Sequence, residues 1–132
     1  MAKFSSSTVL DGGTDLIRTL AATVGRVKLH VVKAYTFGDT YAVVVANSCG
    51  SIDLVAADVV QSTVTNNRRT TFAAKTISLS ASSGATPNLH MAVVDSTGTA
   101  VLYVADETSD QVLTAGGTFS VPAFTYDLNQ PV

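Results

Sequence analysis

The side chains that most often carry out chemistry are scarce in this chain. It has two histidines, His30 and His90, a single cysteine, Cys49, and a single glutamate, Glu107. Acid–base catalysis, a nucleophile or a metal site needs several such groups close together. No His, Cys and Asp residues occur at ligand spacing, and no cationic neighbour follows Cys49 in the sequence. We therefore predict no catalytic residue, no metal ligand and no cofactor site, and we expect structural or surface histidines and a buried cysteine.

Short glycine-rich and acidic stretches do not complete a known functional motif. The pairs Gly12-Gly13 and Gly116-Gly117 lack the lysine of a phosphate-binding loop, and Ser5-Ser6-Ser7 does not fit the nucleophile elbow of hydrolases. The acidic loop Asp106–Asp110 could supply oxygen ligands to calcium. It lacks the alternating ligands and central glycine of an EF-hand loop, so we expect a solvated loop.

Two segments are candidates for contact with a partner protein. Arg68 and Arg69 are the densest basic spot and follow the turn signal Asn66-Asn67. They could bind a carboxylate or phosphate group on a neighbouring subunit, or they could be solvated at a hairpin tip. The Ser/Thr-rich segment 1–10 could be an arm that reaches a neighbour. The predicted interface residues are thus Phe4, Val9, Leu10, Arg68 and Arg69.

Composition limits the class of protein. The chain has 132 residues, of which 46% are hydrophobic and 14% are charged, which predicts one folded domain over residues 1–132. Its net charge of -2 disfavours binding to nucleic acid or to an acidic membrane. The most apolar window, 41–60, is interrupted by polar residues and should not span a membrane. The start has no apolar signal region, and one cysteine cannot form an intrachain disulfide, which together fit a cytoplasm.

The same composition favours strands over helices. The chain has 19 Val, 18 Thr and 13 Ser but one Glu and no Trp. We therefore predict a mainly β fold, an antiparallel β-sandwich or barrel with one short N-terminal helix. The predicted parts are the arm 1–10, a helix over 14–24 and a β-rich body over 27–129. The small number of charged side chains also suggests a protein that packs against copies of itself or a partner.

Hydrophobic periodicity gives the individual elements. Apolar positions at helical spacing place the helix, with Asp11 or Thr14 as its N-cap and Gly25 beyond its end. Alternation predicts a strand over 27–34. The run 41–46 fits either a buried strand or a short helix.

The second half of the chain reads as strands and turns. Two short strands are expected at 51–56 and 58–65, and a long strand at 70–81. The strongest hairpin joins 89–94 to 100–105 across a turn that contains glycine. After Pro122 the apolar alternation changes phase, which predicts a bulge at a sheet edge or corner.

Four stretches together resemble a family of small virion proteins of tailed bacteriophages. They are STVLDGGTDLI (7–17), the stretch 68–80 with its AKTISL, HMAVVDSTGTAVLY (90–103) and LTAGGTFSVPAFTYD (113–127). The resemblance covers most of the chain, and its motifs are structural rather than chemical. It implies a β-rich component of the particle, such as a capsid decoration (cement) protein, and no catalytic residue is carried over.

The leading expectation is therefore a non-enzymatic virion protein that binds the outer shell as a symmetric homo-oligomer. Its partners would be the major capsid protein or other virion proteins, and it would be assembled in the host cytoplasm. One alternative is a component of the tail or of the head-to-tail connector. Another is a glycan-binding module for host recognition, which would need Tyr35, Phe37 and Tyr41 to form a solvent-facing platform.

Overall fold

The computed structural model of this protein describes residues 3–5, 15–64, 67–107 and 109–128. Every strand pairing in these ranges is antiparallel. The predicted mainly β, antiparallel architecture is thus confirmed. In chain order the elements are β1 (Lys3–Ser5), α2 (Leu16–Ala21), β2 (Val27–Val32), α3 (Tyr41–Ala46), β3 (Ser48–Leu54), the 3-10 helix η1 (Ala56–Asp58), β4 (Val59–Val64), β5 (Asn67–Phe72), β6 (Lys75–Ser78), β7 (His90–Asp95), β8 (Ala100–Asp106), β9 (Thr118–Val121) and β10 (Phe124–Leu128).

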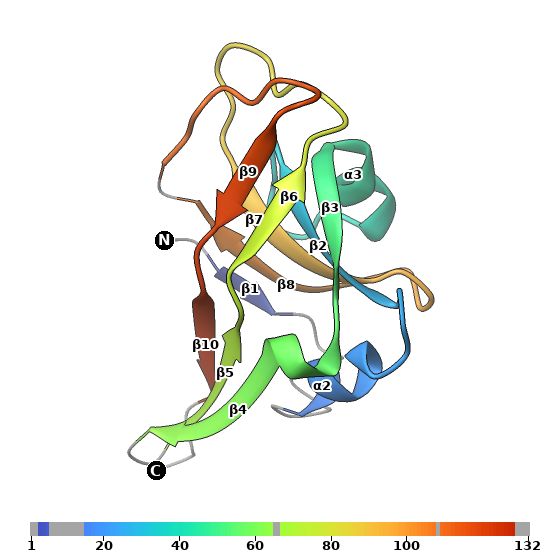
Figure 1. Cartoon of the computed structure of the whole chain (residues 1–132), viewed down its shortest axis with the longest axis vertical. Coiled ribbons are helices and arrows are strands. Elements are labelled where there is room, and N and C mark those ends of the chain that lie inside the picture. The colour runs from blue at the N-terminus through green and yellow to red at the C-terminus, as the bar shows by residue number, and fades with distance from the viewer. Residues whose placement is uncertain (1–2, 6–14, 65–66, 108, 129–132) are drawn as a thin grey trace.

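The largest sheet has five strands in the order β1-β8-β7-β2-β3 (Figure 1). Its centre is the predicted hairpin, now β7 and β8, in which Asp95 lies opposite Ala100. The register shifts between Val93 and Val94, so the hairpin contains a bulge. Thr99 closes the turn with a φ of 50°, in the left-handed region.

Two smaller sheets lie beside it, a three-stranded sheet in the order β10-β5-β4 and a two-stranded sheet of β6 and β9. The prediction of one long strand over 70–81 is wrong. The chain leaves β5 at Ala73, whose backbone N–H donates to the Asp58 carbonyl at 2.8 Å, and it then enters β6 in a different sheet. The phase change at Pro122 has the same origin, because β9 pairs with β6 whereas β10 pairs with β5.

One glycine allows the five-stranded sheet to approach β6 closely. Gly50 of β3 forms an isolated antiparallel bridge with Leu79. A Cβ atom at position 50 would lie 2.5 Å from the carbonyl oxygen of Ser78. Only glycine therefore fits here without movement of the backbone.

The helices differ from the prediction in number and length. The helix expected over 14–24 spans only Leu16–Ala21, with Asp15 as its N-cap residue. The ambiguous run 41–46 is a second helix, α3, and its first turn is capped by the Thr40 hydroxyl, which accepts the N–H of Val43 at 3.4 Å. A cap at this position is a local helix signal that apolar periodicity does not register.

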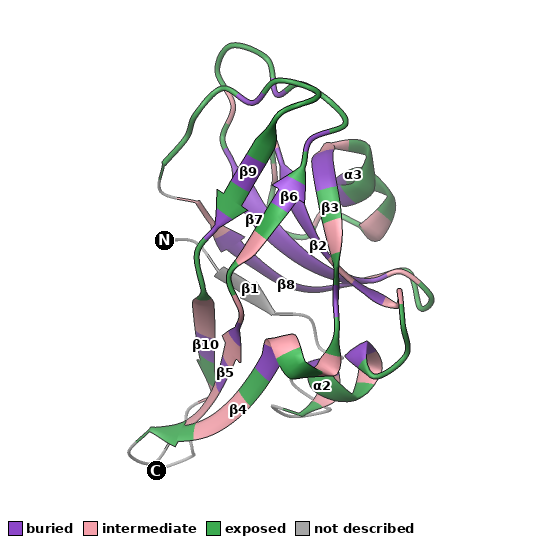
Figure 2. Cartoon of the chain, viewed as in Figure 1, coloured by how far each residue is buried: buried purple, intermediate pink, exposed green. Residues whose placement is uncertain are grey.

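Two clusters of buried side chains cover the two faces of the five-stranded sheet. Figure 2 shows that β2, β7 and β8 of this sheet are buried along most of their length. The larger cluster joins this sheet to α2 and to the smaller sheets. The smaller one packs under α3 and includes Val44 together with Ala92, Val94 and Val104. The strands that are apolar on both faces are therefore covered, at least in part, by other segments of the same chain. The largest fully buried side chains are Tyr103, Phe72, Ile17, Leu29, Leu54, Ile77, Leu89 and Leu102.

Candidate functional site

The N-terminal segment 1–10 is predicted to reach a neighbouring molecule. At Lys3–Ser5 it instead forms β1 and pairs with β8 of the same chain, with Phe4 opposite Val104. This pairing satisfies backbone groups at the edge of β8 that would otherwise be exposed. Val9 and Leu10 lie outside the described residues, so their contact with a partner stays a prediction.

Both arginines of the predicted interface are bound by residues of their own chain. Arg69 holds Asp127 in a bidentate pair, with Nε 2.8 Å from Oδ1 and Nη2 2.9 Å from Oδ2. Arg68 donates from Nη1 to the Thr63 hydroxyl at 2.8 Å. These contacts tie β5 to β10 and to β4. At this exposure the Arg69–Asp127 ion pair contributes at most about 1 kcal/mol, so Arg69 remains able to meet a partner.

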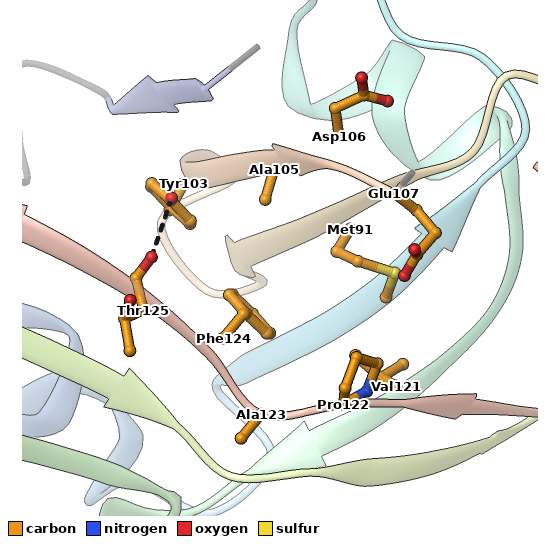
Figure 3. A pocket seen from close by; sticks show the side chains of 10 residues that line it. All are labelled: Met91, Tyr103, Ala105, Asp106, Glu107, Val121, Pro122, Ala123, Phe124 and Thr125. Carbon is orange, nitrogen blue, oxygen red and sulfur yellow. Dashed lines mark hydrogen bonds between the residues drawn. The ribbon is translucent and has the colours of Figure 1, made fainter. Parts of the chain in front are cut away.

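A cavity of about 300 Å³ opens where β9 continues into β10 (Figure 3). One wall comes from β7 and β8, and the other comes from the segment around Pro122. The side chains that make it mostly apolar are Met91, Tyr103, Ala105, Val121, Pro122 and Phe124. Because its walls come from segments far apart in the sequence, the cavity depends on how the sheets are stacked.

The tyrosine in this cavity is neutral and hydrogen-bonded. Burial raises the pKa of Tyr103 to about 12. Its hydroxyl donates to the carbonyl oxygen of Thr125 at 3.4 Å, the contact drawn in Figure 3. The phenol therefore links β8 to β10.

The carboxylate of Glu107 gives the cavity a negative charge at its rim. Figure 3 shows the Glu107 side chain turned toward Met91 and the Asp106 carboxylate turned away from it. Glu107 accepts the N–H of Ser109 at 3.2 Å, and Asp106 lies 3.6 Å from Nε2 of His90. Within the described ranges Glu107 forms no salt bridge with Lys or Arg. This apolar recess with the Glu107 carboxylate at its rim suits an apolar group that carries a positive charge next to it.

The outer edge of β4 is a second surface that could bind protein. Among the described strands only β5 pairs with β4. Figure 1 shows β4 at the rim of the molecule, where the three-stranded sheet extends away from the body. Val60 is 54% exposed and Val64 is 38% exposed. The strand contains no charged residue and no proline, which are the usual guards of an exposed edge.

The two histidines lie on adjacent strands of the five-stranded sheet. Nδ1 of His90 donates to the carbonyl of Asn88 at 3.0 Å, and its ring centroid lies 5.4 Å from that of Tyr35. Nδ1 of His30 lies 2.8 Å from the hydroxyl oxygen of Ser48. No group of three or more His, Cys, Asp or Glu residues positioned for a metal occurs in the described part of the chain. Cys49 is fully buried, as predicted, and burial raises the pKa of its thiol.

We expect His30 to make folding sensitive to acid. Burial, with a smaller effect from the charge of Lys28, lowers its pKa from 6.5 to about 4. The unfolded chain then binds the proton first, so the stabilisation is complete above pH 6.5 and is lost as the pH falls toward 4. Between pH 8 and pH 5 the free energy of unfolding should fall by about 2 kcal/mol through this group.

Urea denaturation of the wild type and of His30→Gln at both pH values measures this effect. The difference between the two pH values should be about 2 kcal/mol smaller in the variant. Equal differences in the two proteins would show that His30 does not titrate in this range.

The three aromatic residues of a glycan platform do not act together. Tyr35 and Tyr41 are half-buried against the cluster under α3, and only Phe37 is largely exposed, at 77%. A sugar-binding surface usually needs rings that present a shared face to solvent. This arrangement does not favour the glycan-binding alternative.

Sequence reasoning did not identify the cavity or the β4 edge. The edge had a signal, because four of the six residues from Val59 to Val64 are β-branched and none is charged. The cavity had none, since its residues are apolar positions in separate segments. They resemble ordinary core residues until the sheets are stacked.

Comparisons with known proteins do not place the chain in a family. No family model, no curated protein and no solved structure matches this sequence or its fold.

In the part of the chain that the structure describes, no helix has the length and apolar character needed to cross a membrane.

Proposed function

We propose that this chain is a non-enzymatic structural protein of a tailed-bacteriophage virion, a decoration (cement) protein that binds the outer capsid as a symmetric oligomer. The resemblance of four stretches to such proteins supports the family. The structural observation that carries the proposal is the apolar recess with its negative rim. It offers a binding site to another protein without a set of reacting groups around it.

The occupant of the recess is a segment of the coat protein that presents an apolar side chain next to Lys or Arg. The apolar group would lie against Met91 and Phe124, and the cation would meet Glu107. Apolar burial contributes about 25 cal/mol per Å², so one side chain that loses about 100 Å² of exposed surface contributes about 2.5 kcal/mol. Such contacts are weak singly and become strong when several subunits of an oligomer bind the same shell.

The test is the copy number of the chain in purified particles, measured by quantitative mass spectrometry against the coat subunit. We expect a stoichiometry comparable with that of the coat. In particles supplied with limiting Glu107→Gln protein, occupancy should fall about fivefold, which corresponds to about 1 kcal/mol for a partly exposed ion pair.

Asp53→Asn is the matched control, because it removes the same charge from a carboxylate on β3 that does not line the recess. Its occupancy should equal that of the wild type. A few copies per particle, in the rotational order of the tail, would instead support the tail or connector alternative. Absence from particles would refute the virion proposal, and equal losses for the two variants would refute the role of the recess.

A further inference from the structure

The edge strand β4 has an outer face that reads the same in both directions. Strand residues alternate between faces, and Val59 is buried whereas Val60 is exposed. Val60, Ser62 and Val64 therefore share the outer face, with the serine between two valines. A strand with this pattern can pair with a second copy of itself.

Only one register of such a pairing places valine opposite valine and serine opposite serine. In an antiparallel pair related by a twofold axis, residues on the same face must lie opposite each other. With the axis at Ser62, each Val60 faces the Val64 of the other copy and each Gln61 faces Thr63. A shift of the axis by one residue in either direction places a valine opposite Ser62.

We propose that two copies of this chain pair edge to edge through β4, about a twofold axis at Ser62. The two three-stranded sheets then form one continuous six-stranded sheet. The β4 contact would be the one that forms the symmetric oligomer of the proposed function. The inference rests on the proposed function only for this assignment.

Charge favours this edge over the other open edges in the described structure. The edge strands β1, β3 and β10 carry Lys3, Asp53 and Asp127, and β6 carries Lys75. A charged side chain on an edge strand disfavours pairing with a further strand. The uncharged strand β9 has only four residues and is followed directly by Pro122, which has no N–H to donate.

The side chains that lie beside Ser62 on the neighbouring strands carry no net charge. Ser62 lies beside Arg69 in β5, and Arg69 lies beside Asp127 in β10. Each Arg69 is neutralised by its own Asp127. Two copies can therefore meet at Ser62 without repulsion between their Arg69 side chains.

The contact is small, which sets its strength. The described strand supplies five residue pairs, from Val60 opposite Val64 through the axis and back. This is less than a standard interface, so we expect a dissociation constant on the order of 100 µM for the isolated dimer. Binding of several subunits to one particle would raise the effective concentration.

Disulfide trapping tests the register. Opposite residues in an antiparallel pair have Cα atoms about 4.5 to 5.5 Å apart, within the range of a disulfide. Mild oxidation of Ser62→Cys at about 0.5 mM chain should therefore give a covalent dimer. The wild type, in which the native Cys49 is buried, gives the background level of cross-linked dimer.

Val60→Cys is the matched control on the same face of the same strand. Its own copy lies four residues along the pair, about 14 Å away, so it should give at least fivefold less dimer than Ser62→Cys. The double variant Val60→Cys/Val64→Cys should restore cross-linking. Equal yields from the two single variants would overturn the register.

Sedimentation velocity tests the dimer without cross-linking. The wild type should show a concentration-dependent dimer, and Val60→Lys should abolish it by placing a charge on the edge. Val112→Lys is the control, because Val112 is 60% exposed and lies outside the strands. A wild type that is monomeric up to 1 mM, or a dimer lost only in Val112→Lys, would overturn the proposal.

These outcomes are separable from those of the proposed function. A monomeric chain found at coat stoichiometry would remove the β4 dimer and leave the capsid assignment. A chain that dimerises through β4 but is absent from particles would remove the capsid assignment and leave the β4 dimer.

Discussion

Replacing Phe72 with alanine should lower the free energy of unfolding by about 3 to 5 kcal/mol. Phe72 is fully buried in β5, and its ring centroid lies 4.6 Å from that of Phe124 and 6.1 Å from that of Tyr103. Tyr103 belongs to the five-stranded sheet, so this stack of rings holds the two larger sheets together. The substitution removes the ring and leaves a cavity that the rigid strands cannot close. Urea denaturation followed by circular dichroism measures the loss.

Phe37→Ala is the control for the loss of a ring without the loss of packing. Phe37 is 77% exposed, and its replacement should change the free energy of unfolding by less than about 0.5 kcal/mol. Phe72→Leu should fall between the two variants, because it keeps most of the buried apolar volume. A loss below 1 kcal/mol in Phe72→Ala would mean that the ring stack does not join the sheets.

Replacing Asp95 with alanine should lower the free energy of unfolding by about 3 kcal/mol. This carboxylate is buried at the end of β7 and accepts two hydrogen bonds from Arg26, each at 2.9 Å. It also accepts the backbone N–H groups of Thr97 and Gly98 in the hairpin turn. The variant leaves a half-buried guanidinium without its partner and two turn donors without an acceptor. Urea denaturation of both proteins at pH 7 measures the difference.

The same carboxylate should protect the fold against mild acid. Hydrogen bonds from Arg26, followed by smaller contributions from the turn, hold the pKa of Asp95 below its ordinary value of 3.8. A lowered pKa stabilises the fold above the pKa of the unfolded chain, and this stabilisation is lost as the pH falls through the lower value of the folded chain. Asp95→Asn should therefore show a smaller loss of stability below pH 4 than the wild type.

Asp53→Asn is the control for this acid limb. Asp53 forms a more exposed ion pair with Lys28, so its replacement should change stability by less than about 1 kcal/mol. If Asp95→Asn and Asp53→Asn have the same stability from pH 7 to pH 3, the buried pair has no special role in the hairpin.

The two proposed surfaces lie on opposite edges of one small sheet. In the order β10-β5-β4, the recess borders β10 and the proposed dimer contact uses β4. Occupation of one therefore leaves the other free. A dimer through β4 would carry two recesses, and two weak contacts with a capsid would then add as a bivalent attachment.

The predicted elements that agree with the structure depend on local signals. The hairpin of β7 and β8 has two apolar runs of strand length and a short turn between them, so its pairing is determined by neighbouring residues. Cys49 was expected to be buried because no cation lies near it in the sequence to activate a thiol, and the structure buries it. Strand composition was equally informative, because valine and threonine favour extended backbone wherever they occur.

The elements that were wrong depend on contacts between distant residues. The alternation from Thr70 to Ala81 is continuous in sequence, yet the chain changes sheets at Ala73 because β4 and β10 pair with its first half and β9 pairs with its second. The arm over 1–10 stays a prediction, because only Lys3–Ser5 of this segment is described, and there the chain pairs with the edge of β8. A strand finds its partner by matching edges in space, and no local pattern records that choice.

By itself the sequence determined that this chain is β-rich, has little charge and contains few His, Cys and Glu side chains, since these properties depend on composition and local periodicity. The tertiary structure alone decided where the strands divide into three sheets, which apolar residues line a recess and which strands lie at the edges of the sheets. Those features arise when segments far apart in the chain pack together, because burial and backbone pairing are satisfied by the whole fold.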